Sequence, residues 1–428
     1  MKSMKKSWFN LIIVFVCALG LISLFGGAAS GNEAGGWKWK AEAGMGLTLD
    51  TNVYKFSSSQ SDRFDANSTS DQMSGRYEDM DSESDFIFTP QLKATFKRPG
   101  LGGRTFSVRP SVAYNVYSKN MEKNFFEFGI GLRQQVEDHA SVGLELDYAP
   151  NIFKKNYLSG AADKDLTFSV GLPTSIIQDN EEIFSPAHYD KTKITVDYSR
   201  RLWKSAKSAM TNLELEKVSG RVLAGYESKS YDAPFAVRDE GSLFAGFDVK
   251  LALYKDTAFT FSYLFKSIDT DVGTEMLIRD EPDFAVDLNG DGIPDSFDTV
   301  ADLNGDGDSL DINVPTLQNV DRSRNQHSLG VKASTKIGEG WKGYAKYEVR
   351  FASYKSEERF DVTRVDRTDT RQKVGLGIKG ELAPRWTMDL GWTLTHNEAS
   401  REGLAVVDKA EAKSYNKHVF AALVSYRF

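Results

Sequence analysis

Cysteine and long apolar segments are almost absent from this 428-residue chain. Its single cysteine, Cys17, cannot close an internal disulfide bond, which excludes a fold held together by disulfides. After residue 30 no segment reaches the roughly 20 apolar residues that a transmembrane helix needs. A bundle of membrane-spanning helices is therefore excluded. The mean hydropathy of -0.41 and the 12% of aromatic residues instead fit a chain whose apolar residues are spread thinly over many strands.

The chain also lacks a basic excess and a recognisable catalytic motif. Its net charge of -7 and its pI near 5.5 argue against nucleic acid as a partner, because no basic cluster accompanies the aromatic residues. The five histidines are scattered, without His-Glu-x-x-His or Gly-x-Ser-x-Gly. His188 lies near Asp190, but one such pair is expected by chance. We expect that the protein is not an enzyme.

The first 30 residues have the three parts of a secretory signal peptide. Lysines at positions 2, 5 and 6 precede an apolar run over residues 11–25, and small residues follow at 26–30. We expect cleavage after Ala29 or Ser30, which makes residues 31–428 the mature chain. The alternative is an uncleaved membrane anchor.

Apolar residues alternate with others along most of the mature chain. The last segment shows this most clearly, with apolar side chains at every second position: Phe420, Ala422, Val424, Tyr426 and Phe428. A period of two predicts strands, and it gives each strand one face for lipid and one for water. Because hydrocarbon cannot hydrogen-bond to an open sheet edge, such strands must close on themselves in a membrane. The sequence therefore predicts an all-β fold, a transmembrane antiparallel up-and-down β-barrel.

About 14 strands are expected, and counts of 12 or 16 remain open. Short turns alternate with long polar loops, notably 50–85, 154–188 and 270–325, so the short turns should be periplasmic and the long loops extracellular. Pro90 and Pro110 should break the pairing of the second and third strands. The expected strands are 37–49, 86–97, 105–117, 124–136, 141–153, 189–202, 211–231, 241–254, 258–269, 326–337, 341–354, 370–381, 385–396 and 416–428.

The acidic segment 270–325 contains a candidate Ca²⁺ loop. Asp-Leu-Asn-Gly-Asp-Gly occurs twice, at 287–292 and 302–307, and no lysine, arginine or histidine lies between Asp280 and Asp321. This spacing wraps oxygen atoms around a hard cation, with glycine at the sharp turn. We expect a structural Ca²⁺ that orders an extracellular insertion, with a solvated acidic loop as the alternative. The candidate ligands are Asp287, Asn289, Asp291, Ile293 (carbonyl), Asp295 and Asp298, and, in the less regular second copy, Asp302, Asn304, Asp306, Asp308 and Asp311.

Charged residues fall out of phase with the apolar face and should point into the lumen. Inward charges require water, and a barrel of about 14 strands is wide enough to hold a solvated pore unless loops fill it. A closed but solvated lumen is the alternative. A slight cationic excess is expected on the strands after residue 326, where the candidate pore-lining residues are Lys332, Lys342, Lys346, Glu348, Arg350, Lys373 and Lys379.

These features resemble two known groups of proteins. The signal peptide, the alternating strands and the final Tyr426 and Phe428 resemble Gram-negative outer-membrane β-barrel proteins, particularly porins. The double Asp-rich motif is similar to the calcium loops of thrombospondin type 3 modules and dockerin, over about 25 residues only. The first resemblance implies an outer-membrane location, outer-membrane lipid and the barrel assembly machinery as partners, and a channel.

Two functions are compatible with this sequence. One is a porin-like channel for passive passage of small hydrophilic solutes or of a surface polymer. The other is a surface structural or binding protein, which uses the barrel as an anchor and the calcium-ordered loop to contact a surface or periplasmic partner. The oligomeric state is left open.

Overall fold

The computed structural model describes residues 36–58, 61, 64, 80–158, 184–204, 215–233, 235–253, 256–270, 273–277, 316–356, 364, 367–401 and 414–428. The expected signal peptide, residues 1–30, and the candidate Ca²⁺ ligands between 287 and 311 lie outside this part of the chain. Within it, no helix is long and apolar enough to cross a membrane.

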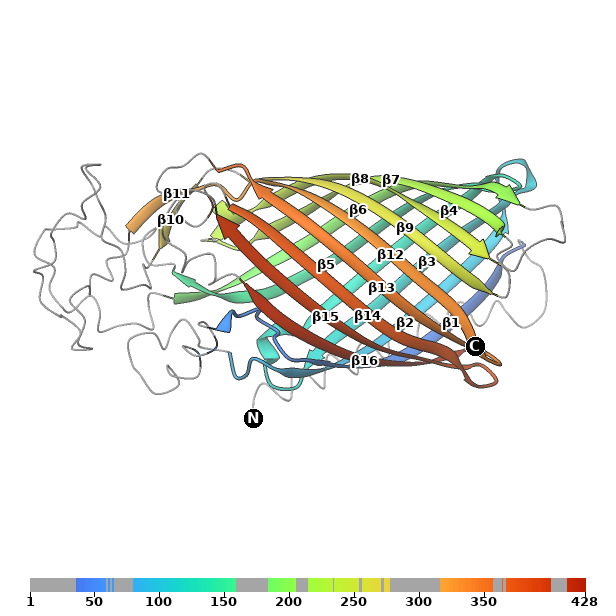
Figure 1. The fold of residues 1–428 in the computed structure, drawn as a ribbon, viewed down its shortest axis with the longest axis horizontal. Coiled ribbons are helices and arrows are strands. Elements are labelled where there is room, and N and C mark those ends of the chain that lie inside the picture. Colours follow the sequence, from blue (N-terminus) through green and yellow to red (C-terminus); the bar gives the residue numbers. More distant parts are fainter. Residues whose placement is uncertain are drawn as a thin grey trace, which may run out of the picture.

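Fourteen antiparallel strands close into one barrel, which confirms the predicted fold class (Figure 1). In the described part of the chain, short 3-10 turns between strands are η1 (Leu101–Gly103), η2 (Met121–Lys123) and η5 (Phe235–Arg238). The barrel strands are β1 (Lys38–Asp50), β2 (Asp85–Pro99), β3 (Thr105–Tyr117), β4 (Phe125–Glu137), β5 (Ala140–Leu158), β6 (Phe184–Lys204), β7 (Leu215–Tyr231), β8 (Glu240–Leu253), β9 (Thr257–Thr270), β12 (Arg324–Gly338), β13 (Trp341–Tyr354), β14 (Arg367–Ala383), β15 (Trp386–Arg401) and β16 (Tyr415–Arg427).

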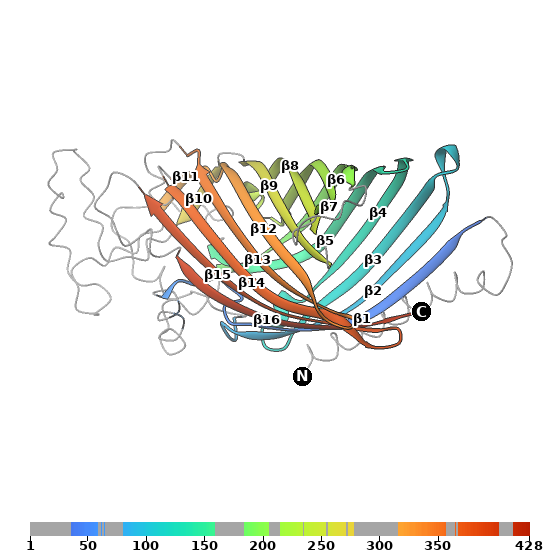
Figure 2. The same ribbon diagram turned by 45° about the vertical axis from the view of Figure 1, so that its right-hand side comes forward.

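Each barrel strand pairs with its neighbours in chain order, and β1 pairs with β16 to close the ring (Figure 2). The one departure from simple chain order is that β9 pairs with β12. The two strands between them, β10 (Gly273–Leu277) and β11 (Thr316–Val320), form a separate two-stranded sheet. The sequence predicted no strands there, because it treated 270–325 as one loop.

The pairing gives the barrel two chemically different faces. On one face lie large apolar side chains that remain exposed, such as Met45 (52%), Leu243 (64%) and Phe420 (48%). Because side chains alternate along a strand, the residues between them line the lumen and carry most of the charges. An apolar exterior around a charged interior is the arrangement of a transmembrane barrel.

The two ends of the barrel differ. At one end, here called the short-turn end, strands meet in tight connections such as the one between β12 and β13, where Gly340 has a φ of 73° that glycine adopts without strain. Exposed aromatic rings gather there, including Trp37, Trp203, Trp386 and Phe428. At the opposite end, called the long-loop end, β1, β5 and β15 end and β2, β6 and β16 begin (Figure 1).

Strand pairing is irregular near two prolines and at two bulges. The β2–β3 pairing skips residues 89–90 and 94–95 without a shift in register, so the break expected at Pro90 and Pro110 is confirmed. Strands β5 and β6 extend beyond the predicted limits of 153 and 189. The β5–β6 register shifts twice, between Ala149 and Ile152 and between Phe153 and Lys155, which hides the period of two in this part of the sequence.

Among the residues that the structure describes, some of the buried apolar side chains gather in two small clusters at the long-loop end. In one cluster Phe56 and Met80 pack with Phe153. In the other, Ala187, Tyr231 and Phe235 pack together. These clusters hold segments against the inner wall of the mouth, and they shape the site described next.

Candidate functional site: a lysine-lined cavity in the lumen

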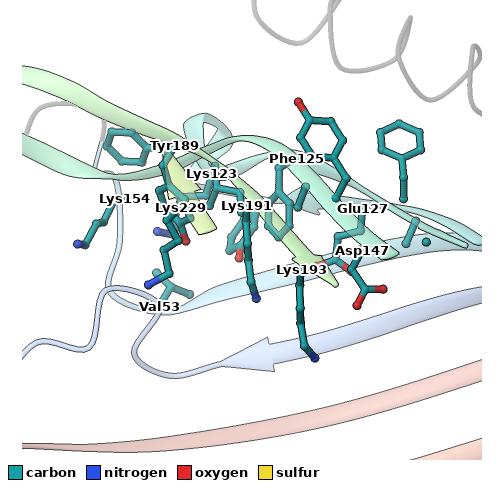
Figure 3. A pocket seen from close by; sticks show the side chains of 18 of the residues that line it. Val53, Lys123, Phe125, Glu127, Asp147, Lys154, Tyr189, Lys191, Lys193 and Lys229 are labelled. Atoms are coloured by element: carbon teal, nitrogen blue, oxygen red, sulfur yellow. The ribbon is translucent and has the colours of Figure 1, made fainter. Parts of the chain in front are cut away.

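A cavity of about 760 Å³ occupies the lumen near the long-loop end (Figure 3). Its walls come from strands β1 to β7, from β16, from η2 and from the segment 51–58 that follows β1. The charged residues that line it are eight lysines and three acids, and no arginine or histidine is among them. They are Lys55, Lys93, Lys123, Lys154, Lys191, Lys193, Lys229 and Lys417, with Asp50, Glu127 and Asp147.

Strand alternation places the two lysines of β6 in this cavity. Ile194 and Val196 are exposed on the outer face, so Lys191 and Lys193 turn inward. In the ladder Lys193 lies opposite Asp147 of β5. Figure 3 shows the side chains of Lys191 and Lys193 extending in the same direction from their strand into the opening.

A local hydrogen-bond pattern forms the segment that carries Lys55. The Asn52 side chain donates to the Phe56 carbonyl (2.8 Å), and the Phe56 amide donates to the Asn52 side-chain oxygen (2.8 Å). The Lys55 amide also donates to the Asn52 carbonyl (3.3 Å), and Lys55 has a φ of 61°. Asparagine commonly bonds to nearby backbone in this way, and it stabilises a tight loop. The loop places Lys55 in the lumen.

Aromatic packing fixes this segment against the barrel wall. The Tyr54 and Phe56 rings stack with centroids 5.3 Å apart, and the Tyr54 hydroxyl donates to the Asn120 side-chain oxygen (2.9 Å). Phe56 packs in turn against Phe153, which is almost completely buried on β5. Rings in such contacts stabilise one another by about 0.5–1.5 kcal/mol beyond the burial of their area. The segment is therefore built into the mouth of the barrel.

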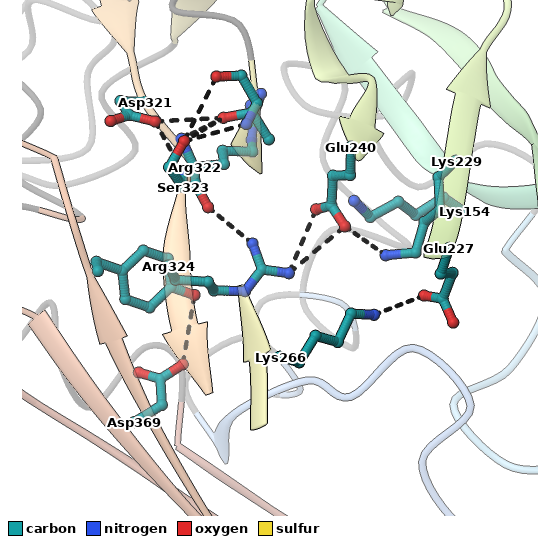
Figure 4. Close-up of polar contacts among 12 residues, drawn as sticks. Lys154, Glu227, Lys229, Glu240, Lys266, Asp321, Arg322, Ser323, Arg324 and Asp369 are labelled. Atoms are coloured by element: carbon teal, nitrogen blue, oxygen red, sulfur yellow. Dashed lines mark hydrogen bonds and ion pairs between the residues drawn. The ribbon is translucent and has the colours of Figure 1, made fainter. Parts of the chain in front are cut away.

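Some of the cavity's lysines form ion pairs with nearby carboxylates. Lys229 Nζ lies 2.6 Å from Glu240 Oε2 (Figure 4). Lys191 Nζ lies 3.7 Å from Glu227 Oε2. Lys417 forms an ion pair with Asp50. The two glutamates also bind cations from outside the cavity: Arg324 lies 3.4 Å from Glu240, and Lys266 lies 2.8 Å from Glu227.

Four other lysines of the cavity have no carboxylate within 4.0 Å among the residues that the structure describes: Lys55, Lys93, Lys123 and Lys193. Two of them contact aromatic rings instead. Lys123 Nζ lies 4.4 Å from the centre of the Tyr54 ring, and Lys193 Nζ lies 5.5 Å from that of Phe244. A ring face holds an ammonium in place without cancelling its charge. The cavity thus keeps an excess of positive charge.

The surroundings of Lys55 weaken its hold on a proton. Burial among protein atoms, together with the positive charges of Lys417 and Arg371, lowers the pKa of Lys55 to about 7. Arg350 and Lys229 act in the same direction. These four cations belong to β16, β14, β13 and β7, so Lys55 is surrounded by positive charge from several parts of the wall.

Lys123, on η2, is affected in a similar way. Burial and the positive charge of Lys417 lower the pKa of Lys123, Asp50 and Asp85 partly oppose them, and the resulting pKa is about 8. Lysines whose pKa falls this far change charge near neutral pH, which an ordinary lysine does not.

The predicted pore-lining residues lie together on β12, β13 and β14. In the ladder Lys342 faces Lys379, Glu348 faces Lys373, and Arg350 faces Arg371. Glu348 Oε1 lies 3.7 Å from both Lys373 Nζ and an Arg371 nitrogen, and Lys379 Nζ lies 3.8 Å from Asp389. Lys332 Nζ lies 5.0 Å from the centre of the Tyr344 ring, and Lys346 passes over Gly375, where any side chain would collide with it.

The histidines do not assemble with an acid and a nucleophile in the described residues. His188 packs its ring 5.4 Å from that of Phe153, whereas the oxygens of Asp190 accept hydrogen bonds from the Tyr148 hydroxyl (2.7 Å) and the Asn151 amide (2.9 Å). His327 bonds to the Tyr263 hydroxyl at 2.9 Å. Within the same residues no group of three or more His, Cys, Asp or Glu side chains is placed to hold a metal ion.

Sequence reasoning located the inward face but missed the main concentration of lysine. Lys191 and Lys193 are out of phase with Ile194 and Val196, so the period of two could have placed them in the lumen. Lys55 could not be found in this way, because it lies in a non-repetitive segment that follows a strand.

No protein-family model matches the chain, and no curated protein matches it either. Solved structures of bacterial barrels do resemble it. The anion-selective porin from Comamonas acidovorans is 9% identical, with a TM-score of 0.35, over 92% of this chain and 99% of that one. OprD from Pseudomonas aeruginosa is 8% identical, with a TM-score of 0.34, over 92% and 97%. The translocator domain of autotransporter NalP from Neisseria meningitidis is 11% identical, with a TM-score of 0.31, over 96% and 97%. Similarity at this level indicates nothing about the function of this chain.

Proposed function

We propose that the protein is an outer-membrane channel through which small hydrophilic solutes cross passively. The observation that carries this proposal is the charged lumen. Eight lysines and three acids line one cavity inside a ring of strands whose outer face is apolar. Moving an unpaired ion from water into a dry interior costs several kcal/mol even after relaxation. Charges at this density are therefore compatible with the fold only if water fills the lumen.

The outer-membrane location rests on the barrel and on the sequence. The predicted signal peptide would direct the chain out of the cytoplasm, and closed barrels with an apolar exterior are the strand-built structures that can span a bilayer. The final strand, β16, carries Tyr426 near its end and is followed by Phe428, and the two rings lie 5.0 Å apart near the short-turn end. We infer that this end faces the periplasm and that the barrel assembly machinery inserts the chain.

The second candidate function is that of a surface anchor with a calcium-ordered loop. The small sheet of β10 and β11 favours it, because this sheet brings residues 277 and 316 together at the base of the acidic segment. The two Asp-rich repeats lie between these two strands in the sequence. Such a loop could bind Ca²⁺ and contact a partner at the cell surface, and it could do so on a conducting barrel as well.

Single-channel recording in planar bilayers tests the proposed function. Purified, refolded protein is added to one chamber in 1 M KCl. A water-filled lumen should give stable current steps that are proportional to voltage. Protein that inserts into the bilayer without any current, and that gains protease resistance with Ca²⁺, would support the anchor function instead. Insertion is checked independently by the shift in gel mobility between heated and unheated samples.

A further inference from the structure

We propose that the lumen is selective for anions and that the cavity binds small multivalent oxyanions, with Lys55, Lys93, Lys123 and Lys193 as the selective groups. This inference rests on the proposed channel function, because it assigns a solute class to the same lumen. It starts from a contrast in charge. The whole chain carries a net charge of -7, yet lysines outnumber acids by eight to three around this cavity.

The excess of lysine charge in the cavity does not arise because the lumen as a whole lacks carboxylates. Two of the other cavity lysines form ion pairs with glutamates. Glu240 accepts from Lys229, and Glu227, which accepts from Lys266 (Figure 4), lies 3.7 Å from Lys191. The chain can therefore supply carboxylates inside the barrel. It supplies none within 4.0 Å of the four selective lysines, in the part of the chain that the structure describes.

The four selective lysines come from four different elements around one space. Lys55 is on the segment after β1, Lys93 is on β2, Lys123 is on η2, and Lys193 is on β6, and all four line the same cavity. A solute that enters the cavity is thus approached by ammonium groups from several sides. Four separate ammonium groups favour an ion with more than one negative charge, because each ammonium can donate up to three hydrogen bonds to the oxygens of that ion.

An aromatic contact holds the ammonium group of Lys123 in place before any anion binds. Lys123 lies over the Tyr54 ring, and the segment that carries Tyr54 is fixed by the Asn52 and Phe56 bonds. Lysine side chains normally lose conformational entropy when they are ordered. Because the ring already orders Lys123, less of this cost remains when an anion binds.

The size and the lining of the cavity define the solute class. A volume of about 760 Å³ holds a small organic anion together with water. Carboxylate and phosphate groups share the required chemistry, since both present several acceptor oxygens with negative charge. The tyrosines that line the cavity, such as Tyr117 and Tyr189, supply ring surface for the rest of a solute. Metal cations and ammonium compounds should be disfavoured by the same field.

The first experiment measures ion selectivity in planar bilayers. The zero-current potential is recorded at pH 6 across a tenfold KCl gradient, for wild type, Lys193→Gln and Lys250→Gln. Lys250 lies on β8, outside the cavity, and serves as a matched control for the loss of one charge. We expect wild type to prefer chloride, and the chloride-to-potassium permeability ratio to fall about threefold in Lys193→Gln at low salt. Lys250→Gln should change it less.

The second experiment measures block by probe anions. Citrate and pyrophosphate are added to the wild-type channel and to the Lys93→Gln/Lys193→Gln double variant. Either probe should reduce the wild-type current, and the half-blocking concentration should rise about tenfold or more in the double variant. Stronger block by citrate would identify a carboxylate site, and stronger block by pyrophosphate a phosphate site.

The outcomes separate the two proposals. A conducting channel that prefers potassium, shows no preference, or is not blocked by either probe would overturn the inference and leave the channel function standing. An equal effect of Lys250→Gln and Lys193→Gln would overturn the assignment to this cavity. A protein that inserts and never conducts would overturn the channel function itself.

Discussion

The anion preference of the channel should weaken as the pH rises from 6 to 9. Lys55 and Lys123 are the cause, because their pKa values are lowered to about 7 and about 8. A lysine is charged below its pKa and neutral above it, so both lysines are charged at pH 6 and both are neutral at pH 9. From their pKa values the pair carries about 1.9 charges at pH 6 and about 0.1 at pH 9.

The size of the effect follows from the dimensions of the cavity. A sphere of 760 Å³ has a radius of about 6 Å, so an ion near its centre lies about 7 Å from ammonium groups in the wall. At that distance two unit charges in water interact by about 0.6 kcal/mol, which screening at 0.1 M salt reduces to about 0.3 kcal/mol. The loss of about 1.8 charges makes the cavity less favourable for an anion and more favourable for a cation by about 0.5 kcal/mol each. The two effects add in the chloride-to-potassium permeability ratio, which therefore falls about sixfold.

The assay is the zero-current potential of one reconstituted channel at pH 6, 7, 8 and 9. Lys55→Gln/Lys123→Gln is the matched variant, because it removes both titrating groups and keeps the side chains polar. We expect a titration centred between pH 7 and 8 in wild type and a nearly constant ratio in the double variant. A wild-type ratio that is constant over this range, or a double variant that titrates as strongly as wild type, would refute the reasoning.

Two further predictions concern the barrel wall and the acidic segment. Gly225→Ala should destabilise the barrel by about 1–3 kcal/mol in urea unfolding, because a Cβ there would collide with the Ile194 carbonyl and the Phe244 ring. Gly338→Ala is the control and should be neutral, because a Cβ at that position meets nothing within 4 Å. Equal unfolding midpoints for the two variants would contradict this prediction. Asp291→Ala with Asp295→Ala should abolish any Ca²⁺ protection of the 270–325 segment from protease, and cleavage of the wild type at the same rate with and without Ca²⁺ would reject the calcium site.

The sequence allows the barrel to be predicted well because one physical signal repeats along it. Strand β3 was expected at residues 105–117 and has those limits, since its alternation is uninterrupted. Strand β5 was expected to end at 153 but reaches Leu158, because two bulges reverse the alternation there. Prediction from the period-two alternation fails where pairing with the neighbouring strand keeps a strand extended although its alternation is interrupted.

The candidate site was predictable only in part. Alternation identifies which residues of a strand face inward, but it does not show which inward charges meet in space. Whether Lys193 has a carboxylate partner depends on the registers of β5, β6 and β7, and the position of Lys55 depends on hydrogen bonds of Asn52 and on the packing of Phe56 against Phe153. These are contacts between segments that lie far apart in the sequence or outside any repeat.

The central claim is that a continuous water-filled path runs through the barrel, and the uptake of uncharged sugars by liposomes that contain the protein tests it most directly. Sugars carry no charge, so the result does not depend on lysine selectivity. The account predicts that such liposomes swell in small sugars faster than protein-free liposomes, and that the rate falls as the sugar becomes larger. Liposomes that contain folded, inserted protein and do not swell in any sugar would contradict it.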